Sequence, residues 1–334
     1  MSDQPPTMPN LARTPAGRPV HIPVMRERVV QLLSPALNIP HALLVDGTLG
    51  LAGHAGALLA ANPSARLIGL DRDPHALTHA AEVLTPFTGR YDLVQANFDE
   101  LATVLADRGI QQVQAILLDL GLSSLQIDQP ARGFTYAVDA PLDMRMDPGR
   151  GPTAADVVNS YSLDELVRVL RTYGEEPQAV RIARGIVRAR EQGPLTTSRQ
   201  LVEVIEAAVP QAVRRHGHVA KRTFQALRIE VNGELDALRR VLPQALRALA
   251  VGGRMAVLAY HSLEDRPVKQ SFAAACAPTA PPGLPMVPPR YEARMISLTR
   301  GAERPDAAEI AVNPRASSAR LRAVQRVRPE EVSW

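Results

Sequence analysis

The chain contains very little that could cross-link it or anchor it. Among its 334 residues there is one cysteine, Cys276, which excludes an internal disulfide and a cysteine-based zinc site. A single thiol fits a reducing compartment, and we expect a cytoplasmic protein. The first twenty residues carry no apolar signal-peptide core, and no run of about 18 apolar residues exists anywhere. The sequence therefore predicts neither a secretory signal nor a membrane contact.

Aromatic residues and lysine are also scarce. Aromatics make up 4% of the chain, so Ala, Leu and Val must fill the core of a chain that is 46% hydrophobic. Only two of the 38 basic residues are lysines, and arginine therefore carries the net charge of +4 and the pI of about 9.6. Arginine binds phosphates through paired hydrogen bonds and stacks on bases, but a GC-rich genome also favours arginine codons. Composition permits a nucleic-acid partner without identifying one.

The most informative segment is a glycine-rich loop. The apolar run Leu43–Val45 ends at Asp46, and Gly-Thr-Leu-Gly-Leu-Ala-Gly-His follows before a helical pattern begins. A strand, a tight glycine turn and a helix in this order open the nucleotide site of an α/β domain. The glycines fall as G-x-x-G-x-x-G, unlike the G-x-G-x-x-G of dinucleotide sites, and Asp46 would repel a pyrophosphate. The loop favours a cationic ligand that carries a ribose, such as S-adenosylmethionine, with a purely structural turn as the alternative.

Strand and helix patterns alternate from this loop to residue 120. Strands are expected at 43–48, 66–71, 91–96 and 115–120, with helices at 21–33, 54–61, 74–84 and 98–107. This β-α order predicts an α/β fold with a parallel, doubly wound sheet. Residues 1–20 are polar and proline-rich, and we expect them to form a disordered arm.

The pattern changes after residue 122 and becomes helical from about 153 to 230. Helix starts are marked by Thr153, by Ser162 and by Thr197 or Ser198. The sheet pattern then resumes, with helices at 232–250 and 263–275, strands at 252–260, 293–299 and 321–328, and a proline-rich loop at 277–290. We therefore expect a sheet domain formed by 21–126 and 231–334, with an all-helical domain, 127–230, inserted into it.

Besides Asp46 at the first strand, the ends of the next four expected strands carry candidate site residues, and ligands of open α/β sheets bind there. Asp71 is placed to accept both hydroxyls of a ribose, and Phe98 is placed to lie against an adenine. Asp119 can accept from an adenine or amino N–H, while His261 fits an active-site role and a buried polar role equally well. Each residue alone has an ordinary explanation as a cap or core side chain. Their placement at successive strand ends favours a site.

Two further segments point to a larger substrate. The turn-rich stretch 132–148 follows the fourth strand, where Phe134 and Tyr136 can stack on a base and Asp143 can accept a proton or hydrogen bond. Residues 165–231 contain 12 basic and 7 acidic side chains, and three arginines at i, i+3 and i+7 from Arg181 share one helix face. This pattern suits a phosphate backbone, although a solvated face would look the same.

These segments resemble the bacterial small-subunit ribosomal RNA cytosine-N4-methyltransferases, the RsmH or MraW family, from about His21 to Arg326. The motifs that carry the resemblance are Asp46–His54, Asp71–Pro74, Leu117–Ser124, Arg132–Phe134, Pro141–Pro148, Thr172–Glu176, Thr223–Ile229, His261–Arg266 and Asn313–Arg315. The resemblance implies a Rossmann-like methyltransferase sheet whose inserted helical domain recognises substrate. It also implies methyl transfer from S-adenosylmethionine to the exocyclic N4 of a cytidine in the decoding region of 16S rRNA, within the small ribosomal subunit.

The family's cofactor positions carry over to seven residues of this chain. They are Ala52, Gly53, His54, Asp71, Phe98, Asp119 and Gln126. Two positions depart from the family pattern, since glycine usually stands at the place of Ala52 and proline at the place of Leu125. The resemblance leaves the oligomeric state open, with a homodimer among the options.

The reaction needs a group that accepts a hydrogen bond from the cytosine amine, because the lone pair of that amine is delocalised into the ring. The nitrogen must lie about 3 Å from the sulfonium methyl, and the target base must be unstacked. The Asp/Asn-Pro-Pro-aromatic motif of many amino-methyltransferases is absent, and we expect Asp143 or His261 to be the catalytic acceptor. A non-catalytic, cofactor-binding assembly factor and an NAD-linked oxidoreductase are the alternatives.

Overall fold

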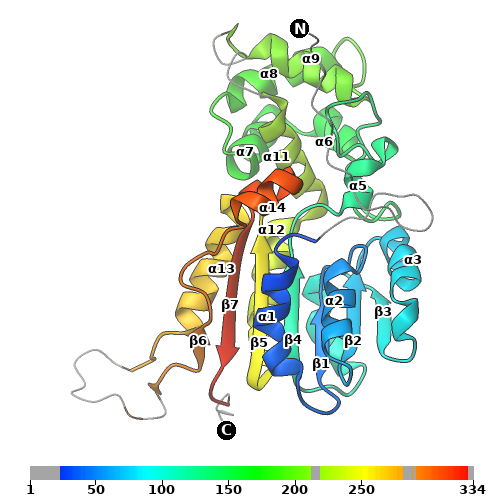
Figure 1. Cartoon of the computed structure of the whole chain (residues 1–334). Coiled ribbons are helices and arrows are strands. Elements are labelled where there is room, and N and C mark those ends of the chain that lie inside the picture. Colours follow the sequence, from blue (N-terminus) through cyan, green and yellow to red (C-terminus); the bar gives the residue numbers. More distant parts are fainter. Residues whose placement is uncertain (1–22, 212–218, 281–287, 289–290, 330–334) are drawn as a thin grey trace, which may run out of the picture.

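The computed structural model describes residues 23–211, 219–280, 288 and 291–329, which form two stacked parts (Figure 1). A seven-stranded sheet with helices on both faces forms the sheet part. A group of helices, placed between the fourth and fifth strands along the chain, forms the helical part. The expected arm, 1–20, and most of the expected loop at 277–290 lie outside the described residues. Within the described ranges, no helix has the length and apolar character needed to cross a membrane.

The elements follow the order expected from the sequence. The sheet part begins with α1 (Arg26–Leu37), β1 (Leu43–Asp46), α2 (Gly53–Ala61), β2 (Arg66–Asp71), α3 (Pro74–Val83), β3 (Tyr91–Gln95), α4 (Leu101–Ala106) and β4 (Val113–Asp119). The helical part contains α5 (Ser124–Asp128), α6 (Ala154–Ser160), α7 (Leu163–Gly174), α8 (Ala179–Arg190), α9 (Ser198–Ala208) and α11 (Ala220–Asn232). The sheet part resumes with α12 (Glu234–Ala248), β5 (Leu249–Ala259), α13 (Ser262–Ala275), β6 (Met295–Ser297), α14 (Ala307–Val312) and β7 (Arg320–Arg326). One-turn 3₁₀ helices lie at Thr85–Phe87, Phe98–Glu100, Pro130–Arg132 and Pro314–Ser318.

The sheet is mixed, with strand order β3-β2-β1-β4-β5-β7-β6. Strands β1 to β5 are parallel, which confirms the expected Rossmann-like α/β sheet. The two last strands exist where they were expected, and β7 is antiparallel to both β5 and β6, a direction that the sequence analysis did not assign. The apolar pattern of a strand predicts its burial and leaves its direction and neighbours undetermined.

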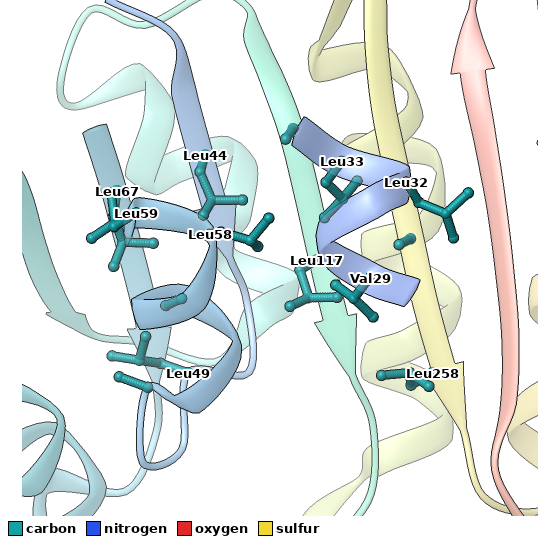
Figure 2. Close-up of a cluster of buried hydrophobic side chains, with 14 of the residues drawn as sticks. Val29, Leu32, Leu33, Leu44, Leu49, Leu58, Leu59, Leu67, Leu117 and Leu258 are labelled. Atoms are coloured by element: carbon teal, nitrogen blue, oxygen red, sulfur yellow. The ribbon is translucent and has the colours of Figure 1, made fainter. Parts of the chain in front are cut away.

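Aliphatic side chains fill the core, as the shortage of aromatics requires. On one face of the sheet, Leu33 of α1 and Leu58 of α2 pack with Leu44 and Leu117 of the strands, and all four side chains are fully buried (Figure 2). Helices α4, α12 and α13 cover the opposite face. The helical part buries a third cluster of its own, so each part of the molecule has a separate core.

Hydroxyl side chains begin the helices of the helical part as expected. Thr153, Ser162 and Thr197 each accept a hydrogen bond from the backbone N–H three residues later, at 3.0, 3.3 and 3.4 Å. These caps satisfy donors that a helix N-terminus would otherwise leave free. Of the two residues proposed to start α9, Thr197 is the cap, while the hydroxyl of Ser198 donates to the carbonyl of Val138.

Candidate active site

The glycine-rich loop joins the carboxyl ends of three neighbouring strands. Asp46, the last residue of β1, accepts from the backbone N–H of Thr48 at 3.1 Å. The Thr48 hydroxyl accepts from the backbone N–H of Asp119 on β4 at 2.6 Å, and Gly50 N donates to Asp71 Oδ2 on β2 at 2.8 Å. The structure therefore brings Asp46, Asp71 and Asp119 to one edge of the sheet, as the spacing of the strand ends predicts.

The loop turns sharply into α2 at Ala52 and Gly53. Ala52 has φ of 58° and ψ of 22°, which is the left-handed region that glycine adopts more easily. A Cβ on Gly53 would lie 2.5 Å from Cγ of Pro23, so the close packing of the two segments requires glycine there. The left-handed backbone explains why a family with this loop would prefer glycine at the place of Ala52.

A carboxylate, a phenol and an imidazole meet next to this loop. The Tyr260 hydroxyl, just beyond β5, donates to Asp119 Oδ1 at 2.8 Å. His54 Nε2 lies 3.5 Å from Asp119 Oδ2 on the other side. The sequence analysis did not identify Tyr260, although its position at a strand end beside His261 was a usable signal. The two neighbours fix the orientation of the Asp119 carboxylate.

Burial of the carboxyls at the strand ends favours their neutral form unless a cation is close. Burial raises the pKa of Asp46 to about 7, although His54 and the Thr48 N–H oppose the change. Burial likewise raises the pKa of Asp71 to about 6, against the hydrogen bonds from Asp73 N and Gly50 N. Desolvation and the Asp119 carboxylate raise the pKa of Tyr260 well above its ordinary value, so the phenol stays protonated as a donor. A positively charged ligand would therefore be stabilised here.

The residues present fit S-adenosylmethionine. His54 is 5% exposed; its Nε2 has the 3.5 Å contact with Asp119, and its Nδ1 makes no hydrogen bond within the described residues. A buried polar group without a partner is costly, so a polar ligand group at this place would satisfy it. Asp71 lies at the position suited to a ribose, and the acidic surroundings suit a sulfonium and an amino group. The arrangement does not suit a phosphate.

Phe98 and Gln126, the two other expected cofactor residues, flank this edge. Phe98 begins the 3₁₀ turn after β3, and its Cβ would lie 3.3 Å from a Cβ placed on Gly47. Gln126 is 4% exposed, and its Oε1 accepts from Ser123 N at 3.1 Å at the start of α5. These positions stay predictions for cofactor contact, since local contacts also account for them.

His261 lies at the same edge, next to a buried carboxylate. Its Nε2 is 3.1 Å from Glu264 Oε1, and Glu264 Oε2 accepts from Tyr260 N at 2.7 Å. Burial raises the pKa of Glu264, but the contacts with His261, Arg228 and Tyr260 N outweigh it and hold that pKa below its usual value. Glu264 is therefore ionised, and it orients the imidazole. His261 is also the N-cap residue of α13.

Asp143 lies instead in the segment under the helical part. Its Oδ1 accepts from Arg145 Nε at 2.9 Å and its Oδ2 from Arg145 Nη2 at 2.7 Å. Burial raises the pKa of Asp143, and the hydrogen bonds and charge of Arg145 lower it further than burial raises it. Phe134 is buried in the core of the helical part, and Tyr136 packs edge-on against Phe224 with ring centroids 5.4 Å apart. These two rings serve the core of the helical part.

Comparison with known proteins identifies the family. The sequence matches the model of the MraW methylase family over residues 18–327. It is 58% identical over 311 residues to a "Ribosomal RNA small subunit methyltransferase H" of Streptomyces avermitilis, covering 93% of this chain and 98% of that protein. It is 59% identical over 310 residues to the protein of the same name in Acidothermus cellulolyticus, covering 92% of this chain and 94% of the other. A match this extensive leaves one conclusion: the chain belongs to the MraW methylase family.

Proposed function

We propose that this chain is a methyltransferase that uses S-adenosylmethionine to methylate the exocyclic N4 of a cytidine in the decoding region of 16S rRNA. The observation that carries the proposal is the group of acidic residues at the sheet edge beside His54, whose Nδ1 makes no hydrogen bond within the described residues, in a chain of the MraW methylase family. Relatives over 50% identical bear the name "Ribosomal RNA small subunit methyltransferase H". Retention of the cofactor residues favours catalysis over a role as a non-catalytic assembly factor.

Four side chains at this edge of the sheet hold the cofactor in our proposal. Asp71 accepts the ribose hydroxyls, and Asp119 accepts from an amino group or the adenine, held in place by Tyr260. His54 satisfies a further polar group of the ligand, and Asp46 adds negative charge beside it. The bound cofactor supplies a methyl group on a sulfonium, which is electrophilic without the help of a metal.

Of the two acceptors expected from the sequence, we propose His261 as the group that receives the hydrogen bond of the cytosine amine. A proton on Nε2 would face the ionised Glu264, which leaves the lone pair of Nδ1 free to accept. No hydrogen bond within the described residues occupies that Nδ1. Both oxygens of Asp143 are bound by Arg145, so Asp143 would have to exchange that partner first.

The helical part offers a basic surface for the RNA. Arg181, Arg184 and Arg188 of α8 are exposed, whereas Ile182 and Ile186 of the same helix are buried. Exposed guanidinium groups at this spacing can follow a phosphate backbone. We propose that this surface holds 16S rRNA within the small ribosomal subunit, in the cytoplasm, with the protein acting as a monomer or a homodimer.

The test is incubation with methyl-labelled S-adenosylmethionine and undermethylated small subunits, followed by mass mapping of the rRNA nucleosides. We expect N4-methylcytidine at one site in 16S rRNA. Cofactor binding without incorporation would support the assembly factor instead. Calorimetric titration with NAD tests the alternative of an NAD-linked oxidoreductase, and we expect no binding.

Two variants test the acceptor. We expect His261→Ala to lower kcat about 10²-fold or more with little change in cofactor affinity, because an acceptor acts mainly in the transition state. We expect Asp143→Asn to change RNA binding and stability more than kcat. If both variants keep wild-type turnover with cofactor bound, neither residue is the acceptor.

A further inference from the structure

Three motifs of the sequence contain residues to which the proposed function gives no role: Asp71–Pro74, Arg132–Phe134 and Pro141–Pro148. The structure joins them through Arg72, Asp73, Arg132 and Asn232, which we call the interdomain network. We propose that the interdomain network is a positioning device that couples occupancy of the cofactor site at Asp71 to the placement of the helical part. The inference rests on the proposed function for the identity of the two ligands.

Arg72 and Asn232 form the first half of the network. Arg72 directly follows β2, and both of its Nη atoms donate to the carbonyl of Asn232, the last residue of α11, at 3.0 Å. Arg72 Nη2 also donates to Asn232 Oδ1 at 2.8 Å. The Asn232 side chain in turn donates to the carbonyl of Met144 at 2.7 Å and accepts from Met146 N at 2.9 Å. One amide therefore joins the sheet edge, the end of the helical part and the 141–148 segment.

Arg132 and Asp73 form the second half. Arg132 Nη1 donates to Asp73 Oδ2 at 2.8 Å, and the Asp73 side chain is fully buried. Arg132 Nη2 donates to the carbonyls of Arg145 and Met146 at 3.0 and 2.9 Å. The planar guanidinium makes these contacts in one fixed arrangement, which lysine cannot reproduce.

Asp71 connects this network to the cofactor site. Its Oδ1 accepts from Asp73 N at 2.9 Å, and its Oδ2 accepts from Gly50 N of the glycine-rich loop at 2.8 Å. A ribose bound at Asp71 shares these two oxygens, so the position of the carboxylate and the position of the Asp73 backbone depend on each other. The neighbouring residues Arg72 and Asp73 both bind the helical part or the segment beneath it.

The 141–148 segment has little freedom to move independently if the backbone at Asp73 is displaced. A Cβ on Gly133 would lie 2.2 Å from the carbonyl oxygen of Pro141, so the two stretches touch through backbone atoms. Met144 has φ of 60°, a conformation that a side chain of this type adopts only when its surroundings impose it. Displacement at Asp73 is therefore passed on to the helical part instead of being lost in the segment.

A purely structural connection would hold the two parts together equally well with and without cofactor. Coupling predicts instead that S-adenosylhomocysteine, the product, changes the affinity for RNA and that RNA changes the affinity for the product by the same factor. We expect a factor of about 5 or more in the wild-type protein, the lower end for coupled sites. A factor of one in the wild type would overturn the inference.

The variants are Asn232→Ala, which removes the shared amide, and Arg132→Lys, which keeps the ion pair with Asp73 but cannot also reach both carbonyls. We expect each to reduce the coupling factor to less than twofold while the affinity for S-adenosylhomocysteine alone changes less than threefold. Arg108→Ala is the matched control, since Arg108 pairs with Asp92 at 2.7 Å away from the network, and it should keep the wild-type factor. Binding is measured by calorimetry for the product and by filter binding for undermethylated small subunits.

Hydrogen exchange gives a readout that requires no RNA. S-adenosylhomocysteine should slow amide exchange in residues 141–148 of the wild type and of Arg108→Ala, and should not do so in Asn232→Ala or Arg132→Lys. Arg132→Lys keeps the test valid if Asn232→Ala fails to fold. If S-adenosylhomocysteine slows exchange in a folded variant as much as in the wild type, the network is only a static connection between the two parts. Because this readout is independent of methyl transfer, its failure and the failure of the proposed function are distinguishable.

Discussion

Replacing Tyr260 by phenylalanine removes one hydrogen bond from the proposed cofactor site and little else. The lost donor leaves Asp119 Oδ1 without the phenol that lies 2.8 Å away. The ring itself stays, and it packs against Gly121, where a Cβ would lie 3.3 Å from Tyr260 Cδ2. The substitution therefore tests whether the orientation of Asp119 depends on this phenol.

The expected magnitude follows from the burial of the pair. A hydrogen bond to a charged group contributes about 1.5–3 kcal/mol, and the side chain of Asp119 is 26% exposed, so water replaces part of the loss. We expect the free energy of unfolding to fall by about 1.5 kcal/mol. If Asp119 also loses its orientation toward the cofactor, a similar loss of binding energy weakens affinity about tenfold.

Urea unfolding of the cofactor-free protein measures the first quantity, and calorimetric titration with S-adenosylhomocysteine measures the second. The slope of the unfolding transition should stay unchanged, because the surface exposed on unfolding is the same. Titration with 5′-methylthioadenosine, which lacks the amino-acid moiety, then separates two roles. A loss confined to S-adenosylhomocysteine assigns Asp119 to the amino group, and an equal loss for both ligands assigns it to the adenosine.

Tyr91→Phe on the edge strand β3 is the matched control, since the structure assigns its hydroxyl no hydrogen bond within the described residues. We expect a loss of less than about 0.5 kcal/mol for this control, as for an ordinary surface substitution. If Tyr260→Phe behaves like Tyr91→Phe in both stability and affinity, Tyr260 does not orient Asp119 and the reasoning is refuted.

Three further predictions follow from the same region. Gly53→Ala should destabilise the protein by about 1–3 kcal/mol in urea and weaken cofactor binding, because its Cβ would meet Pro23 at 2.5 Å; wild-type stability would mean that the segment at Pro23 can move away from α2. The buried carboxyls ending β1 and β2 have folded pKa values of about 7 and about 6, above the ordinary 3.8, so cofactor-free stability should fall as pH rises between about 4 and 7 while cofactor affinity rises. Asp71→Asn should flatten both pH profiles, and parallel profiles for wild type and variant would rule Asp71 out. Asp265→Asn should cost about 3 kcal/mol in urea, since Arg322 donates to both carboxylate oxygens at 2.7 and 3.0 Å and would keep a partly buried charge.

Local features were predictable from the sequence because neighbouring residues determine them. The glycine-rich turn after β1 and the caps at Thr153 and Ser162 depend on side chains within three or four positions. The gathering of Asp46, Asp71 and Asp119 was predictable as well, because parallel strands end at the same edge of a sheet.

Long-range contacts were not predictable, since no local pattern records them. Arg72 and Asn232 are 160 positions apart, and nothing in either neighbourhood indicates the other. Asp143 was predicted as an acceptor, yet Arg145 binds both of its oxygens, whereas Tyr260 was not predicted, yet it contacts Asp119. No local pattern indicated that Arg145 would bind both oxygens of Asp143 or that the Tyr260 phenol would donate to Asp119.

The position of β7 inside the sheet has a consequence for how the molecule assembles. β7 is the last strand along the chain, yet it lies between β5 and β6, and its residues Leu321, Ala323 and Val324 are fully buried. The helical part draws its core from one continuous stretch and can fold as soon as that stretch has been synthesised. Until β5 has been synthesised, β4 is an open edge of the sheet, and β5 is then the open edge until β7 has been synthesised. Open strand edges can pair with other chains. All residues of the helical core are therefore synthesised before the sheet can be completed, and the sheet is complete only when the final strand has been added.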